Sequence, residues 1–183
     1  MVKIFISGIS CVGKSTILEK AAKELNLIFF DFDKEFEIYY NEKIPILQRK
    51  YSQKKYEQLS ITFIKVFLEK VKDKSFIMEI PPRGFKPLYI KEIEKLNNIK
   101  LFAIEDDVFA IAKRVVFYDD AQNVIDMNLT IQQEELVEKQ VKRDKKYFHK
   151  YYLQVKTNKI INLESRDIED SVKLVIKNIK GEL

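Results

Sequence analysis

The sequence is short of the residues from which several kinds of site are built. Its 183 residues include one cysteine, one histidine, four glycines and no tryptophan. A single Cys11 and a single His149 can form neither an internal disulfide nor a Cys/His zinc site. A reducing cytoplasmic location is the expectation that follows.

Long hydrophobic runs are also missing, and no segment approaches the ~20 apolar residues that a membrane-spanning helix needs. Met1 leads directly into an apolar run, so we expect no signal peptide. The length suits one domain, residues 1–183, with a full core. The formal net charge of +5 predicts a mildly basic surface rather than nucleic-acid binding.

Two of the four glycines bound an eight-residue motif. Residues 8–15 read Gly-Ile-Ser-Cys-Val-Gly-Lys-Ser and match the pattern G-x-x-x-x-G-K-[ST]. An apolar strand-like run precedes the motif and a run of helix-forming residues follows it. Glycines let such a loop curl around an anion, and successive N–H groups and the helix N-terminus then point at it. The motif therefore predicts a phosphate-binding loop.

Individual loop residues have distinct expected roles. Lys14 would reach the β- and γ-phosphates of ATP, and the Ser15 hydroxyl would hold Mg²⁺. The predicted nucleotide-binding residues of the loop are Gly8, Ile9, Ser10, Cys11, Val12, Gly13, Lys14, Ser15 and Thr16.

Short apolar runs alternate with helical patterns along the whole chain. We expect strands at 2–7, 27–30, 75–80, 99–104 and 159–163. We expect helices at 14–25, 34–41, 46–72, 88–97, 107–116, 130–152 and 167–179. This alternation is typical of an α/β, three-layer P-loop NTPase fold, in which helices cover both faces of a five-stranded parallel sheet. Ligands of such sheets bind at the carboxyl ends of the strands.

Carboxylates follow the second and third expected strands. Asp31 and Asp33 are two residues apart on an extended segment, and Glu79 lies near the end of an apolar strand. We expect Asp31 and Glu79, with Ser15, to organise Mg²⁺ through water, and Asp33 to orient or deprotonate an acceptor hydroxyl. The structural alternative for Asp33 is a helix N-cap.

Arginines supply the remaining candidates. Arg83 follows Pro81-Pro82, where it could bind a phosphate or carboxylate or be a solvated turn residue. Arg114 begins a stretch, about 114–130, that we interpret as a helical lid or as a plain surface loop. The charged helix at 130–152 carries Arg143, which could face the transferred phosphoryl group, although most of its charges are expected to be solvated.

These features together resemble the shikimate kinase group of small P-loop kinases, within the wider nucleoside monophosphate kinase-like class. The resemblance is strongest over residues 2–40, which contain the strand, the loop and the Asp31-x-Asp33 pair. It implies ATP and Mg²⁺ as cofactors and Asp33 as the residue that holds the acceptor hydroxyl. It also implies that Arg114 meets the nucleotide and that Arg143-x-x-x-Tyr147 is a substrate-binding helix.

The chain departs from that family where the acceptor would bind. Pro81, Pro82 and Arg83 stand where the family has a glycine triplet. The family's carboxylate-binding arginine is replaced near Tyr56-Glu57, and a lid arginine is missing between residues 117 and 128. These changes predict an acceptor other than shikimate. The segment ending in Pro82-Arg83 is similar to adenylate kinases, and the run Lys150-Tyr-Tyr is similar to cytidylate-type kinases.

Three function classes fit these residues. We expect an ATP- and Mg²⁺-dependent phosphotransferase that acts on a small-molecule acceptor, with Lys14, Asp33, Arg83 and Arg143 in the catalytic machinery. The alternatives are a nucleoside monophosphate kinase and a non-catalytic ATP-binding regulatory protein. A GTPase is excluded because residue 161 is isoleucine, not the guanine-reading aspartate. The sequence indicates no membrane partner and leaves the oligomeric state open.

Overall fold

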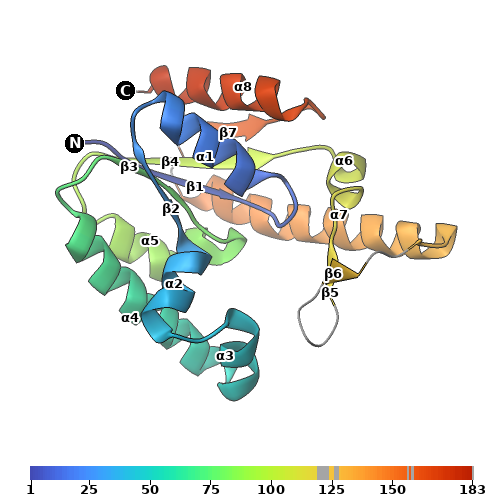
Figure 1. The fold of residues 1–183 in the computed structure, drawn as a ribbon, viewed down its shortest axis with the longest axis horizontal. Coiled ribbons are helices and arrows are strands. Elements are labelled where there is room, and N and C mark those ends of the chain that lie inside the picture. Colours follow the sequence, from blue (N-terminus) through green and yellow to red (C-terminus); the bar gives the residue numbers. More distant parts are fainter. Residues whose placement is uncertain (119–123, 126–127, 156, 158, 183) are drawn as a thin grey trace.

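The fold is built around a parallel sheet, seen edge-on in the computed structural model of Figure 1. The structure describes residues 1–118, 124–125, 128–155, 157 and 159–182. The sheet strands are β1 (Lys3–Gly8), β2 (Ile28–Asp31), β3 (Phe76–Glu79), β4 (Ile99–Glu105) and β7 (Lys159–Asn162). Their order is β2-β3-β1-β4-β7, and every neighbouring pair is parallel. The five predicted strands are confirmed, each to within one residue at either end.

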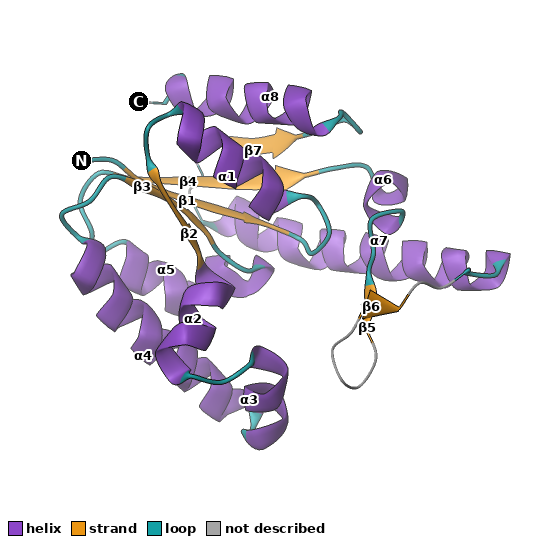
Figure 2. Ribbon diagram, viewed as in Figure 1, coloured by secondary structure: helices purple, strands orange, loops and turns teal. Residues whose placement is uncertain are grey.

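Helices cover both faces of this sheet, as Figure 2 shows. On one face lie α1 (Lys14–Glu24) and α8 (Ile168–Lys180), and on the other lie α4 (Gln53–Val71), α5 (Pro87–Ile93) and most of α7 (Ile131–Gln154). The remaining helices are α2 (Phe32–Tyr40), α3 (Ile44–Lys50), the short 3-10 helix η1 (Pro82–Phe85) and α6 (Val108–Ala112). The predicted α/β three-layer arrangement is confirmed.

Each face of the sheet has its own apolar core because successive strand residues point to opposite sides. On the central strand β1, Phe5 belongs to the core under α4 and α5, whereas Ile4 and Ile6 belong to the core under α1 and α8. All six residues of β1 are buried. A strand buried on both faces is a rigid support, and the phosphate-binding motif begins at its last residue.

One predicted helix is two helices. We expected a single helix over 46–72, but α3 ends at Lys50 and α4 begins at Gln53. Ser52 separates them: it is the N-cap of α4, and its hydroxyl accepts a hydrogen bond from the N–H of Lys55 at 3.4 Å. The continuous apolar pattern hid this break, because a serine can be an interior residue as well as a cap.

The predicted helical lid at 114–130 is wrong in its secondary structure. Helix α6 ends at Ala112, and the described residues beyond it form two short antiparallel strands, β5 (Phe117–Tyr118) and β6 (Val124–Ile125), before α7 begins. Residues 119–123 and 126–127 of that stretch lie outside the described part. No helix of the described chain is both long and apolar enough to cross a lipid bilayer.

Candidate active site

The turn between β1 and α1 follows a path that demands glycine at two positions. Gly13 has φ of 94° and precedes the first residue of α1, and Cys11 also has a positive φ, 63°. A Cβ atom on Gly8 would lie 2.6 Å from the carbonyl oxygen of Ile104 on the adjacent strand β4, a distance that real Cβ atoms essentially never show. The spacing of the two glycines in the motif is therefore a requirement of the loop itself.

The Lys14 side chain lies across this loop and is only 7% exposed. Its Nζ donates a hydrogen bond to the carbonyl oxygen of Ile9 at 3.1 Å and lies 3.7 Å from Oε1 of Glu79. Burial lowers the pKa of Lys14, and the carboxylates of Glu79 and Asp33 oppose that change. An ammonium in such a desolvated place interacts strongly with any anion that enters the loop.

Glu79 ends β3 with one carboxylate oxygen available for a ligand. Its Oε2 is buried and accepts no hydrogen bond of standard geometry from the described residues. Burial raises the pKa of Glu79, while the Lys14 ammonium and the nearby Ser15 hydroxyl lower it. An orphaned carboxylate oxygen beside a serine hydroxyl is a donor pair that suits Mg²⁺ or a water bound to it.

Asp31 is the register partner of Glu79 in the sheet, and it has a structural role as well. Its Oδ1 accepts hydrogen bonds from the N–H groups of Asp33 at 3.0 Å and Lys34 at 3.2 Å. Asp31 is therefore the N-cap of α2, and the interpretation of Asp33 as that cap is wrong because Asp33 lies inside the first turn. A contribution of Asp31 to metal binding stays a prediction.

Asp33 and Arg83 lie within electrostatic range of each other. The Asp33 side chain is exposed, yet desolvation by the surrounding protein raises the pKa of its carboxyl against the effect of the Arg83 guanidinium. Arg83 Nη2 donates to the hydroxyl of Tyr56 at 2.7 Å, and its guanidinium carbon lies 4.9 Å from the centroid of the Tyr56 ring. The ring and the hydrogen bond hold the guanidinium in one orientation.

A second tyrosine completes this cluster. The hydroxyl of Tyr89 on α5 and Nε of Arg83 are both buried without a hydrogen bond of standard geometry to the described residues, and the two side chains interact electrostatically. We name Asp33, Tyr56, Arg83 and Tyr89 the acceptor cluster. It contains a carboxylate that could accept from a hydroxyl and a guanidinium that could bind an anion.

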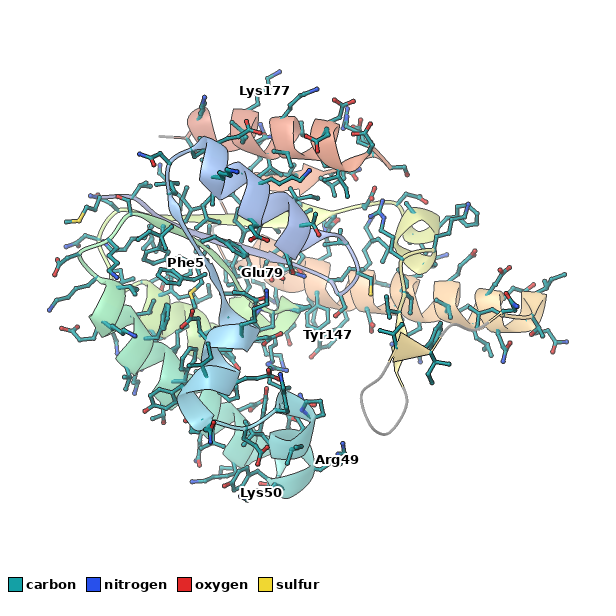
Figure 3. All side chains as sticks on the ribbon, viewed as in Figure 1. Phe5, Arg49, Lys50, Glu79, Tyr147 and Lys177 are labelled. Carbon is teal, nitrogen blue, oxygen red and sulfur yellow. The ribbon has the colours of Figure 1, made fainter. Side chains whose placement is uncertain are left out.

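Arg143 is not brought to the acceptor cluster by any described contact. It is exposed on α7 and donates to Oε1 of Gln140 on the preceding turn at 2.6 Å. One turn further on, Tyr147 lies within electrostatic range of Lys86 and Glu57, which flank the cluster. Figure 3 labels Tyr147 on α7 and Glu79 near the centre of the molecule. A catalytic role for Arg143 stays a prediction.

Arg114 lies on the other side of the phosphate loop, at a cavity of about 690 Å³. Its Nη1 donates to the carbonyl oxygen of Val12 at 3.4 Å, and its Nη2 lies 2.8 Å from Oδ2 of Asp106. The cavity is lined by Val12, Gly13, Thr16, Ile17, Arg114, Leu163, Arg166, Asp167, Ile168, Glu169 and Ser171. A hollow lined by both the phosphate loop and two arginines is a candidate for the nucleoside part of a bound nucleotide.

Another hollow, of about 620 Å³, lies between α6, the β5–β6 pair and α7. Its lining is largely apolar and contains no residue of the phosphate loop. The cavity at Arg114 is therefore the better candidate for the nucleoside, because only that one is continuous with the predicted phosphate site.

Three site residues escaped the sequence analysis. Tyr56 and Tyr89 belong to helices whose amphipathic pattern assigns them to the core, and nothing local indicates that they surround an arginine. Asp106 could have been found, because it directly follows a buried strand, the same position rule that identified Asp31 and Asp33.

Comparisons with known proteins agree with this fold. The shikimate kinase family model matches residues 10–74. Shikimate kinase from Bacteroides thetaiotaomicron superposes with a TM-score of 0.75 and 16% identity, over 98% of each chain. Shikimate kinase from Acinetobacter baumannii, solved in complex with shikimate, superposes with a TM-score of 0.73 and 18% identity. The match covers 100% of this chain and 94% of that one. A gluconokinase from Sinorhizobium meliloti superposes with a TM-score of 0.57 and 11% identity, over 99% of this chain and 93% of that one. No curated protein matches the chain in sequence.

The structural matches confirm the predicted fold, and the family match over residues 10–74 confirms the predicted resemblance to shikimate kinases. The match of residues 10–74 to the shikimate kinase family model supports the predicted phosphotransferase.

Proposed function

We propose that the protein transfers the γ-phosphoryl group of ATP to a hydroxyl group of a small, anionic acceptor other than shikimate. The observation that carries this proposal is the convergence of Lys14, Glu79, Asp33 and Arg83 at the carboxyl ends of three adjacent strands. The charges of Glu79 and Asp33 both act on Lys14, and Arg83 acts on Asp33. A single domain of residues 1–183 would thus hold donor and acceptor side by side.

The donor half would hold the polyphosphate. The N–H groups of the loop and the Lys14 ammonium would bind the β- and γ-phosphates, where negative charge changes position during transfer. The cavity beside Arg114 and Arg166 would take the nucleoside.

Ser15 and Glu79 fit a magnesium ion. The Ser15 hydroxyl would bind it directly, and the orphaned Oε2 of Glu79 would accept a hydrogen bond from one of its waters. No three His, Cys, Asp or Glu side chains gather into a metal site among the described residues, so the phosphates and water would supply the other ligands. When bound, Mg²⁺ neutralises charge on the β- and γ-phosphates.

The acceptor half would align the attacking group. Asp33 would accept the proton of the acceptor hydroxyl as its oxygen bonds to the γ-phosphorus and the bond to the β-phosphate oxygen breaks. A carboxyl whose pKa is raised by desolvation is a stronger base than an ordinary aspartate once it is ionised. Arg83, oriented by Tyr56, would bind a carboxylate or phosphate of the acceptor.

The acceptor side also argues against shikimate. Its arginine comes from η1, whereas Tyr56 and Glu57 on α4 stand where the resemblance places the family's carboxylate-binding arginine. An anion held from η1 would sit at a different place relative to Asp33. The neighbour that is a gluconokinase supports a sugar acid as one class of acceptor. The position of Arg83 after two prolines keeps a nucleoside monophosphate as the alternative.

A panel of acceptors tests this proposal. Shikimate, gluconate, nucleosides and nucleoside monophosphates would each be added with ATP and Mg²⁺, and ADP release would be followed. We expect one anionic hydroxyl compound to stimulate release and shikimate to do so poorly, with the Lys14→Ala variant as the control for contaminating kinases. Tight ATP binding without stimulation by any compound would favour the non-catalytic regulatory alternative.

A further inference from the structure

Asp106, the residue after β4, carries a carboxylate that the proposed phosphoryl transfer does not use. It is 0% exposed. A buried carboxylate is costly unless charged or polar partners compensate for the lost water, so its surroundings should explain its presence. It lies at the carboxyl edge of the sheet, where the functional residues gather.

The partners of Asp106 belong to separate parts of the chain. Its Oδ2 lies 2.8 Å from Nη2 of Arg114, beyond α6. Its Oδ1 accepts hydrogen bonds from the N–H of Ser165 at 2.7 Å and from the N–H of Asp107 at 2.8 Å. Its backbone carbonyl oxygen accepts one from Nζ of Lys145 on α7 at 2.8 Å. One carboxylate group therefore joins an arginine to a distant loop.

That loop, residues 163–167 between β7 and α8, has an unusual backbone. Glu164 and Ser165 are consecutive non-glycine residues with positive φ, 53° and 56°. Such conformations are sparsely populated and persist only when the surrounding structure enforces them. The hydrogen bond from Ser165 N–H to Asp106 is one such constraint, and another joins the N–H of Leu163 to the carbonyl oxygen of Glu105 at 2.8 Å.

Both structures held by Asp106 are walls of the 690 Å³ cavity. Its lining includes Arg114, the 163–167 loop residues Leu163, Arg166 and Asp167, and the phosphate loop. Arg114 is also tied to the phosphate loop through the carbonyl oxygen of Val12. Without a fixed partner, a long arginine side chain would sample several rotamers, and binding would have to order it.

We propose that Asp106 is a positioning residue for the nucleoside part of the donor: it aligns Arg114 and the 163–167 loop before the nucleotide binds. The inference rests on the proposed function, because it takes the cavity to be the nucleoside site. It predicts that Asp106 affects the binding of a nucleotide but not the binding of a bare polyphosphate chain.

The test compares Mg²⁺-ATP with Mg²⁺-tripolyphosphate by calorimetry on the full chain. In Asp106→Asn, the amide oxygen can still accept from Ser165 N–H, but the charge that pairs with Arg114 is gone. We expect the dissociation constant for ATP to rise about tenfold or more, the scale of a lost charged hydrogen bond, and that for tripolyphosphate to change less than about twofold. Asp107→Asn is the matched control: this exposed aspartate caps α6, and asparagine is an equally good cap, so both affinities should stay near wild type.

A double-mutant cycle tests whether Asp106 affects ATP binding through Arg114. If Asp106 acts through Arg114, the variant Asp106→Asn/Arg114→Gln should bind ATP about as weakly as Arg114→Gln alone. Full additivity of the two losses would contradict that route.

The remaining outcomes separate the inference from the proposed function. Unchanged ATP binding in Asp106→Asn, or an equal loss of ATP and tripolyphosphate, would overturn the positioning role, the second result showing that Asp106 only stabilises the fold. Wild-type protein that binds tripolyphosphate and ATP equally well would mean that the cavity is not a nucleoside site. Wild-type protein that binds neither would overturn the proposed function itself.

Discussion

The proposed donor half and the proposed acceptor half of this site are built in different ways. The phosphate loop is one stretch, Gly8–Ser15, and the hydrogen bond of Lys14 within it spans only five residues of sequence. The acceptor cluster comes from α2, α4, η1 and α5, and its central hydrogen bond joins Arg83 to Tyr56, 27 residues away. A contiguous site carries its chemistry in its local spacing, whereas an assembled site depends on how distant elements pack.

Burial has the same kind of effect on one charged group in each half. Burial acts against the charge of Lys14 in the donor half and against the charge of Asp33 in the acceptor half. Each shift favours the neutral form of its group, so bringing the donor's negative phosphates to Lys14 and the acceptor's hydroxyl to Asp33 relieves a cost that is already present in the free protein. The two halves therefore make separable predictions.

The largest effect is expected from the donor half. Lys14→Ala should lower turnover about 10³-fold or more, since it removes a buried charge that stabilises the transferred group. The fold should persist, because no apolar core residue is lost, and circular dichroism would check this. Lys23→Ala, an exposed lysine of the same helix, is the control and should leave turnover unchanged. Equal turnover in Lys14→Ala and wild type would contradict the catalytic role proposed for the phosphate loop.

In the acceptor half, Asp33→Asn should lower turnover about 10²-fold or more while ATP affinity stays close to wild type. Asparagine accepts a hydrogen bond but cannot take the proton. The control is Glu35→Gln, in the same first turn of α2. Equal losses of turnover and ATP affinity would instead make Asp33 a part of the metal site, and the separation between the halves would fail.

The pH profile of kcat/KM also separates the two halves, because Asp33 and Lys14 should control opposite limbs of the profile. Asp33 must be ionised to act as a base, so activity should fall as pH drops through its pKa, which desolvation raises above that of an ordinary aspartate. Lys14 must be charged, so activity should fall as pH rises through its pKa, which burial lowers below that of an ordinary lysine. Asp33→Asn should lose the acid limb and keep the basic one. An acid limb that survives in this variant belongs to another group, with Glu79 the first candidate.

A smaller effect is expected at Arg83. Arg83→Lys keeps the charge but loses the planar group that stacks on Tyr56, so KM for the acceptor should rise roughly tenfold with KM for ATP unchanged. Tyr56→Phe should have the same direction and a smaller size, because it removes only the hydrogen bond. Arg49→Lys, at an exposed arginine of α3, is the matched control. A rise in KM for ATP instead would assign Arg83 to the donor half.

The smallest expected effect is a change in the rate at which Cys11 is alkylated. Cys11 is a half-buried free thiol inside the phosphate loop, so alkylation should be slowed by ATP in proportion to the fraction of protein that has ATP bound. Acceptor alone should not protect it. Protection by acceptor without ATP would show that the two halves overlap at the loop.

The extent to which each half could be predicted follows from these differences. The five strands and the phosphate loop were predicted closely, because apolar runs and glycine spacing are local signals. The break at Ser52, the β5–β6 pair and the N-cap role of Asp31 were missed, since serine and aspartate have the same local pattern in several roles. Asp31 and Asp33 were both assigned to the ligand edge, but which of them caps α2 depends on where the helix begins.

Local sequence by itself determined the parallel α/β layers and the path of the donor loop, because strand runs, helix periodicity and two obligatory glycines need no knowledge of distant residues. Only the tertiary structure decided that Arg83 is held by Tyr56, that Arg143 donates to Gln140, and that Asp106 joins Arg114 to Ser165. A guanidinium or a buried carboxylate has a function only through the partners around it, and packing brings those partners from elsewhere in the chain.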